Sequence, residues 1–356
     1  MKRKHFEAIT PICAVCRQSD IESPLEITRV VREESADILE GILQCSRMGC
    51  QREYPIIDGI PLLVPALRAY VSQNIFPILR RSDFSEAIES ILGDCCGPGS
   101  ALDQTRQHLS SYAWGHYSDQ DPLETKGPKL SLVELLELGL TLAGPLGPGP
   151  ILDAGCAVGR TSFELADRSE QLVLGIDMSF SMLQVASRVL RTGEVHYPRR
   201  RVGLVYDQRT FPVHFKRPDL IDFWVCDALA PPFPKAAFSL VTSLNLLDCV
   251  SSPHEHLVAI ANSLVFGGRA ILCTPYDWSP GATPIEGWIG GHSQRGPQAG
   301  DSAAALRALL TPNAHPASIN QLELLAEAGS LPWRVRLHDR SFVEYATHLV
   351  VAEKRS

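Results

Sequence analysis

The residues best spaced for chemistry form a glycine-rich turn in the middle of the chain. The segment Ile151-Leu-Asp-Ala-Gly-Cys-Ala-Val-Gly159 precedes a helical pattern, and the next strand pattern ends at Asp177. Gly155 and Gly159 permit a tight turn whose backbone can approach a ligand, beside the free N–H groups of a helix N-terminus. Asp177 can accept hydrogen bonds from both hydroxyls of a ribose. Because Asp153-x-Gly155-x-x-x-Gly159 leaves little provision for a pyrophosphate, the pattern predicts a nucleoside site.

Four N-terminal cysteines have the spacing of a metal site. Cys13 and Cys16 form one pair, and Cys45 and Cys50 form a second. Four thiolates on two turns suit a tetrahedral zinc ion, with free buried thiols as the alternative. Because four thiolates leave no open coordination position, we assign this zinc to stability or docking and not to catalysis.

The elements that must position the glycine turn alternate between strands and helices. Strand patterns cover residues 172–177, 223–227, 238–244 and 269–274, and helical patterns cover residues 161–168, 181–191 and 254–264. This alternation predicts an α/β fold with a doubly wound, Rossmann-like parallel sheet. Residues 333–337 and 341–353 alternate like a terminal antiparallel hairpin. Asp227 and Ala228 follow one strand pattern, and Asn245 follows another.

We expect three parts in the chain. Residues 1–65 form a small zinc ribbon of short strands, residues 66–128 a helical connector or cap, and residues 129–356 the α/β domain. In the connector, a helix over residues 84–92 should end in the breaker at residues 93–99. Tyr112, Trp114 and Tyr117 either cover the ligand or pack in the core.

Two segments interrupt the alternation of strands and helices. Residues 192–222 are rich in arginine, proline and aromatic side chains, and they form either a phosphate-binding strip or a solvated hairpin with charged edges. Residues 275–300 are rich in glycine, proline and tryptophan, and they form either a lid or a surface loop.

The composition excludes several classes of protein. With 45% hydrophobic and 21% charged residues among 356, the chain is a folded globular protein. Its net charge of −7 argues against a protein that mainly coats nucleic acid. No apolar run reaches the roughly 18 residues of a membrane span, and no apolar core follows the basic residues 1–5, as a signal peptide would require. We therefore expect a cytoplasmic protein without membrane contact and with reduced cysteines.

From residue 129 to residue 354, the order of these segments resembles the class I S-adenosylmethionine-dependent methyltransferases. The resemblance implies S-adenosylmethionine as cofactor, with the glycine turn at its methionine part, Asp177 at the ribose, and Asp227 with Ala228 at the adenine. Cys156 is expected to be a small filler beneath the cofactor. The full set of expected cofactor residues is Asp153, Gly155, Cys156, Gly159, Asp177, Met178, Asp227, Ala228 and Asn245.

A narrower resemblance extends beyond the cofactor segments. Residues 153–166, 243–248 and 274–291 are similar to the C-terminal methyltransferase domain of ovothiol synthase, which methylates an imidazole nitrogen of 5-thiohistidine. Two departures are evident. The segment around Asn245 continues as Asp248-Cys-Val where we would expect an arginine, and no sulfoxide synthase domain precedes the methyltransferase. A separate sulfoxide synthase would therefore act upstream as a partner.

The resemblance implies a pocket for a small imidazole thiol. Methyl transfer is an in-line displacement, so the protein must hold the nucleophile about 3 Å from the methyl carbon and exclude water. A side chain need only select the imidazole tautomer by bonding its other nitrogen. The candidates for catalysis are Asn245, Tyr276 and Asp277, and those for substrate binding are Asp248, Tyr276, Trp278 and Trp288. Both tryptophans could instead pack the loop.

Two further hypotheses follow from the N-terminus and the insertion. The cysteine segment resembles the zinc-ribbon activator subunits of tRNA and protein methyltransferases, although that family usually has two residues between the second pair of cysteines. Zinc ribbons joined to methyltransferases also resemble ribosomal RNA methyltransferases, so RNA base methylation is one alternative. A catalytically silent scaffold that docks a partner is the other.

Overall fold

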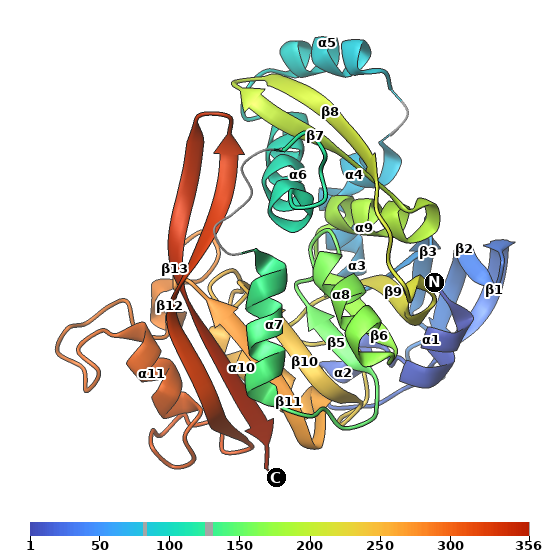
Figure 1. Ribbon diagram of the computed structural model, residues 1–356. Helices are drawn as coiled ribbons and strands as arrows, with labels where there is room; N and C mark the ends of the chain where they lie inside the picture. Colours follow the sequence, from blue (N-terminus) through green and yellow to red (C-terminus); the bar gives the residue numbers. More distant parts are fainter. Residues whose placement is uncertain (81–83, 125–130, 356) are drawn as a thin grey trace.

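The computed structural model describes residues 1–80, 84–124 and 131–355. An eleven-stranded sheet runs through the molecule in the order β1-β2-β3-β4-β9-β6-β5-β10-β11-β13-β12, and β7 and β8 form a separate two-stranded sheet (Figure 1). The strands are β1 (Leu25–Glu34), β2 (Asp37–Cys45), β3 (Glu53–Ile57), β4 (Ile60–Leu63), β5 (Ile151–Ala154), β6 (Val173–Asp177), β7 (Glu194–Val202), β8 (Val205–Pro212), β9 (Ile221–Cys226), β10 (Phe238–Leu244), β11 (Leu264–Thr274), β12 (Leu322–His338) and β13 (Ser341–Lys354).

Helices cover both faces of this sheet. They are α1 (Arg3–Ile9), α2 (Ala14–Arg17), α3 (Leu67–Gln73), α4 (Ile75–Leu79), α5 (Glu86–Cys96), α6 (Ala101–Tyr117), α7 (Leu132–Ala143), α8 (Arg160–Ser169), α9 (Phe180–Thr192), α10 (Pro253–Ser263) and α11 (Ser302–Leu309), with short 3-10 helices η1 (Pro218–Leu220) and η2 (Ile285–Gly287). One apolar core lies between the sheet and α6 to α9, and the other lies between the opposite face and α1, α2, α10 and α11.

The central strands confirm the predicted α/β fold. Strands β4, β9, β6, β5, β10 and β11 pair in parallel, and β13 pairs antiparallel with both β11 and β12. Strands β5, β9 and β10 near the centre are buried along their whole length because both faces of the sheet are covered there, as is typical of parallel sheets. The predicted terminal hairpin is present, and its strands are longer than the alternation indicated.

The N-terminal ribbon continues the central sheet instead of standing apart from it. Strand β4 pairs in parallel with β9, with Leu62 opposite Val225. The segment between α1 and α2 also contacts the α/β domain, because the backbone N–H of Ile12 donates to the carbonyl of Pro232 at 2.8 Å. Side chains of the ribbon and of the α/β domain therefore share one core.

The connector differs in detail from the prediction. Helix α5 runs through Gly93, so the breaker predicted from residue 93 begins only at Gly97, where φ is +76°. An added Cβ at Gly93 would lie 2.4 Å from the Arg106 guanidinium, so the glycine lets this guanidinium pack against α5. The helical pattern that begins at residue 129 becomes α7, which starts after a capping box formed by Ser131; residues 129 and 130 lie outside the described residues.

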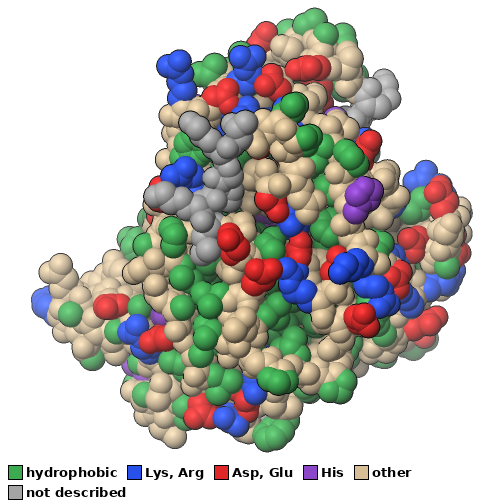
Figure 2. Space-filling view, in the orientation of Figure 1, with side chains coloured by type: hydrophobic (Ala, Val, Ile, Leu, Met, Phe, Trp, Pro, Cys, Tyr) green, Lys and Arg blue, Asp and Glu red, His purple; other side chains and the backbone are tan. Residues whose placement is uncertain are grey.

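The arginine-rich insertion folds into the β7-β8 hairpin, which packs on α6. Its arginines have acidic partners from several elements. Arg209 is paired with Asp121 at 2.8 Å, and Arg199 is paired with both Glu124 and Asp339. On the face shown in Figure 2, basic and acidic side chains are intermixed. In the part of the chain that the structure describes, no helix has the length and apolarity to cross a membrane.

Candidate functional site

A cavity of about 550 Å³ opens where the parallel strands end. Its floor comes from the segments that follow β5, β6, β9, β10 and β11, as expected for an α/β sheet. Its cover comes from α6 and from the β12-β13 hairpin, which pack against each other. The polar floor residues include Asp153, Asp177, Asp227, Asn245, Asp248 and Asp277, and the cover residues include Ser111, Tyr112, His116, Trp333 and Tyr345.

The glycine turn has the backbone conformation that the sequence predicted. Gly155 has φ +74° and Gly159 has φ +87°, a region in which other residues are strained. A Cβ on Gly159 would lie 2.7 Å from the Phe223 ring and 2.8 Å from the Ala186 methyl group. Gly159 also forms the N-cap of α8. Only glycine therefore allows α8 to begin this close to the sheet.

Asp153 braces this turn from below. Its carboxylate accepts hydrogen bonds from Thr161 at 2.6 Å, Ser162 at 2.7 Å and Thr242 at 2.7 Å. The side chain is only 2% exposed, and burial raises its pKa. Asp153 lines the cavity, and both of its oxygens also accept hydrogen bonds within the protein, so its predicted contact with the cofactor stays a prediction. Its structural role is to position the turn.

The acidic residues predicted for ribose and adenine both line the cavity. Asp177 accepts from the backbone N–H groups of Ala157 at 3.0 Å and of Ser179 at 2.7 Å. Asp227 accepts from the Leu229 N–H at 2.9 Å. These bonds fix each carboxylate and leave lone pairs for a ligand. Met178 and Ala228 also line the cavity, whereas Cys156 is buried and is not among the lining residues.

Asn245 and Asp248 have buried polar atoms without hydrogen-bond partners among the described residues. Neither amide atom of Asn245 has a hydrogen-bond partner among the described residues, although both atoms are buried. Asp248 is 3% exposed; one of its carboxylate oxygens accepts from the Asp277 N–H at 2.7 Å, and the other has no partner there. Burial raises the pKa of Asp248. Unsatisfied buried groups are costly, so these atoms are candidates for binding a ligand.

Three residues predicted to contact substrate lie outside the cavity lining. The Tyr276 hydroxyl bonds His348 at 2.7 Å. Trp278 and Trp288 stack on each other with ring centroids 6.3 Å apart, and their N–H groups donate to Ser302 and to the Thr283 carbonyl. They pack the long loop over residues 275–300, because aromatic pairs with satisfied N–H groups make a stable loop core.

The cover contains residues that the sequence did not identify. Tyr112 lines the cavity as the cap prediction allowed, but Trp114 and Tyr117 are fully buried in the core. Trp333 and Tyr345 come from the terminal hairpin and were missed. Trp333 on β12 lies directly opposite Tyr345 on β13, so both side chains share one face of the hairpin, yet only the folded structure shows that this face meets the cavity.

The cavity is acidic. Its lining includes five aspartates and, among the described residues, no lysine or arginine. Burial, with a smaller effect of Arg160, lowers the pKa of His116 to about 3, so this histidine is neutral near pH 7. The Tyr345 hydroxyl donates to Asp277 at 2.9 Å and joins the cover to the floor. Such a cavity favours ligands that carry positive charge.

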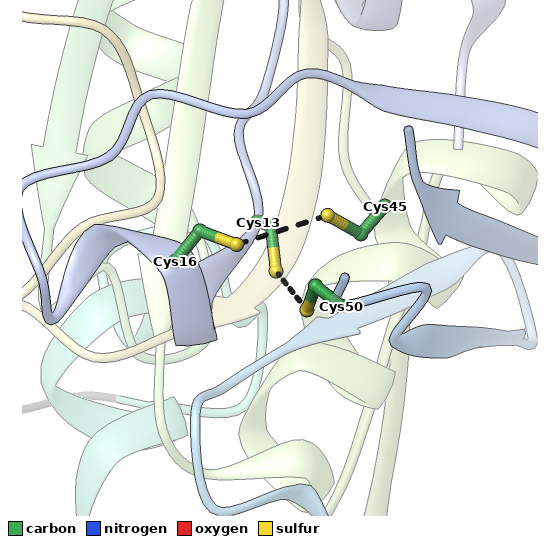
Figure 3. Close-up of side chains that lie close together, drawn as sticks. All are labelled: Cys13, Cys16, Cys45 and Cys50. Atoms are coloured by element: carbon green, nitrogen blue, oxygen red, sulfur yellow. Dashed lines mark hydrogen bonds between the residues drawn. The ribbon is translucent and has the colours of Figure 1, made fainter. Parts of the chain in front are cut away.

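The four N-terminal cysteines converge as predicted (Figure 3). All four sulfurs lie within 4.8 Å of one another, and the Cys13–Cys50 and Cys16–Cys45 sulfur pairs are 3.8 Å apart. Tetrahedral zinc with bonds of about 2.3 Å would separate its sulfurs by about 3.8 Å. The Tyr54 hydroxyl lies 3.2 Å from one sulfur of the cluster, as supporting hydrogen bonds do at metal sites. The cluster could therefore hold a metal ion.

Comparisons with known proteins agree with this architecture. Residues 152–272 match the profile of a family described as a methyltransferase domain. No curated protein matched the chain.

Several solved structures are similar to the chain. The cyclase SpnF is 15% identical with a TM-score of 0.43, covering 71% of this chain and 94% of that one. An S-adenosylmethionine-dependent methyltransferase from Methanosarcina mazei is 19% identical with a TM-score of 0.38, covering 58% and 93%. Phosphoethanolamine N-methyltransferase 2 from Haemonchus contortus, solved with S-adenosyl-L-methionine, is 20% identical with a TM-score of 0.32, covering 41% and 29%.

Proposed function

We propose that this chain, whose residues 152–272 form an S-adenosylmethionine-dependent methyltransferase domain, methylates an imidazole nitrogen of 5-thiohistidine or of a related small imidazole thiol. The observation that carries the proposal is the pair of unsatisfied side chains, Asn245 and Asp248, at the end of a covered cavity. Their position suits a small polar acceptor beside the cofactor. The choice of an imidazole thiol rests on the resemblance of residues 243–248 and 274–291.

The residues present fit the cofactor. When bound, S-adenosylmethionine supplies an electrophilic methyl group. Asp177 would hold the ribose hydroxyls, Asp227 would accept from the adenine amino group, and the aspartate-rich lining would favour the positive sulfonium. The exposed face of Asp177 is already oriented by two backbone N–H groups, so little reorganisation is needed on binding.

The acceptor needs orientation more than activation. A neutral imidazole nitrogen already has a lone pair, so no general base is required for its attack. The Asn245 amide can donate to or accept from the ring and thereby select the tautomer. Tyr112 and Tyr345 of the cover would exclude water from the reacting atoms. Asp277, held by Tyr345, would help to fix the acceptor.

The cysteine cluster would hold a structural zinc ion. The four sulfurs fit tetrahedral coordination without an open position, so the ion would supply stability and no chemistry at the cavity. This assignment is independent of the methylated substrate.

The alternatives receive less support. An RNA substrate needs unpaired cations to neutralise phosphates, but Arg199, Arg201 and Arg209 of the insertion are paired with carboxylates. A catalytically silent scaffold has no need of a covered cavity with orphaned polar groups. The match of residues 152–272 to a methyltransferase domain also favours an enzyme over a silent scaffold.

Mass spectrometry tests the proposal directly. The protein is incubated with S-adenosylmethionine in three parallel reactions, which contain synthetic 5-thiohistidine, histidine or total RNA as the methyl acceptor. We expect a product heavier by one methylene only with 5-thiohistidine. Methylated RNA, or no methylated acceptor despite cofactor binding, would overturn the substrate assignment.

A further inference from the structure

We infer that the acceptor end of the cavity selects its substrate through a protonated amino group held by Asp248 and Asp277, and that it offers no charged partner to a substrate carboxylate. The inference deepens the proposed function and rests on it, because it concerns the same cavity. It predicts which half of an amino-acid substrate the protein recognises.

Asp248 supplies the first part of the argument. Asp248 is one of the residues that line the cavity, its side chain is almost completely buried, and one of its carboxylate oxygens is buried without a partner among the described residues. A buried carboxylate with no cation is expensive unless a ligand completes it. The other oxygen is held by the Asp277 N–H at 2.7 Å, so the free oxygen is fixed in place.

Asp277 and Asn245 supply a matching set of acceptors. Asp277 follows β11 and Asn245 follows β10, so adjacent parallel strands deliver both residues to the same edge of the sheet. The Tyr345 hydroxyl donates to one Asp277 oxygen at 2.9 Å and leaves the other available. An ammonium group has three donors and no acceptor. The Asp248 oxygen, the Asp277 oxygen and the Asn245 amide oxygen are acceptors of the kind that it requires.

The charge of the lining supplies the third part. Carboxylates are usually recognised by arginine or lysine, and the described lining contains neither. His116 is the one histidine in that lining, and it is neutral near pH 7 because burial lowers its pKa to about 3. An acidic cavity therefore repels a substrate carboxylate and attracts an amine.

Three methyl-accepting compounds test the contributions of the substrate's amine and carboxylate separately. 5-Thiohistidine carries both groups, 5-thiohistamine lacks the carboxylate, and the deaminated propanoate analogue lacks the amine. We expect kcat/KM for 5-thiohistamine within about threefold of that for 5-thiohistidine, and a value about 10- to 100-fold lower for the propanoate, the cost of one charge-assisted hydrogen-bonding partner.

The variant Asp248→Asn removes the charge and keeps the shape. It should raise KM for both amines and abolish the preference over the propanoate, while leaving the affinity for S-adenosylmethionine unchanged. Asp94→Asn, on the exposed surface of α5, is the matched control and should keep the preference. If Asp248→Asn weakens cofactor binding instead, Asp248 serves the cofactor and the inference is overturned.

Failure of the inference and failure of the proposed function are distinguishable. If all three thiols are methylated equally well, the proposed function stands and the amine inference is wrong. If none is methylated, the proposed function fails. The amine inference is then tested separately: calorimetry measures the binding of histamine and of imidazole propanoate to the protein loaded with S-adenosylhomocysteine. Histamine binding that Asp248→Asn abolishes would support the inference, and absence of histamine binding would overturn it.

Discussion

At the scale of single residues, Asn245 is the side chain whose loss should affect catalysis most directly. Its φ of +55° is unusual for a residue other than glycine, and its backbone N–H is anchored to the Cys273 carbonyl at 2.7 Å. Strain of this kind is retained where the surrounding structure holds a functional group in place. The amide is therefore fixed before any ligand arrives.

We predict that Asn245→Ala lowers kcat/KM by about 10- to 100-fold because one or two hydrogen bonds to the reacting acceptor are lost. Steady-state kinetics with 5-thiohistidine would measure this, and Asn320→Ala in an exposed loop serves as the control. An Asn245→Ala variant with wild-type kinetics would remove Asn245 from the site.

The sequence located some of these residues better than others. Asp177, Asp227 and Asn245 each follow a recognisable strand, so the rule that parallel strands end at one edge places them correctly. Trp278 and Trp288 lie in a loop without periodicity, where nothing local indicates the direction of a side chain. Their mutual stacking depends on the folded path of residues 275–300.

At the scale of elements, two buried histidines on helices should make the stability of the fold depend on pH. His256 on α10 bonds the Ser243 hydroxyl at 2.8 Å and the Ala228 carbonyl at 3.2 Å, and His116 lies on α6. Burial lowers the pKa of His256 to about 4 and, with Arg160, that of His116 to about 3. The unfolded chain binds these protons at a pKa of about 6.5.

The sign of the resulting pH dependence follows from these shifts. Because the folded pKa values are depressed, the stabilisation is fully present above pH 6.5 and is lost as the pH falls towards 4. The free energy of unfolding should lose about 1.4 kcal/mol per pH unit for each histidine in this range. Urea unfolding at pH 7 and pH 5.5 would measure the loss.

A variant isolates the contribution of one histidine. His256→Gln should show a smaller loss between the two pH values than the wild type, whereas His108→Gln, on the exposed face of α6, should behave like the wild type. Equal losses in all three proteins would show that His256 takes up no proton on unfolding.

The order of strands and helices was predictable, but their partners were not. Periodicity gives β5, β6, β9, β10 and β11 because each is an apolar run between turns. It does not show that α6 covers the cavity, because α6 has a mixed pattern whose buried side includes Asp103 and Arg106. Long-range pairing, such as β4 with β9, has no local signature.

At the scale of the whole molecule, the cysteine cluster belongs to an N-terminal module whose strands continue the central sheet. We predict one zinc ion per chain, and its loss in Cys16→Ser, because a tetrahedral site needs all four thiolates. The thermal midpoint should then fall by several degrees, since metal binding contributes folding free energy. Elemental analysis and a thermal melt would measure both.

Cys95→Ser is the matched control because this thiol is exposed and lies outside the cluster. It should retain the zinc and the midpoint of the wild type. A wild-type protein purified with no bound metal and unresponsive to added zinc would favour free thiols.

The pairing of β4 with β9 also bears on the order in which the molecule is made. Leu62 leaves the ribosome long before its partner Val225 is synthesised, so the ribbon emerges first while the central sheet is still incomplete. Contacts between residues so distant along the chain slow folding. Until β9 arrives, β4 presents an unpaired edge of the kind that recruits other chains. Early capture of an ion by the four cysteines would keep the nascent ribbon compact during that interval.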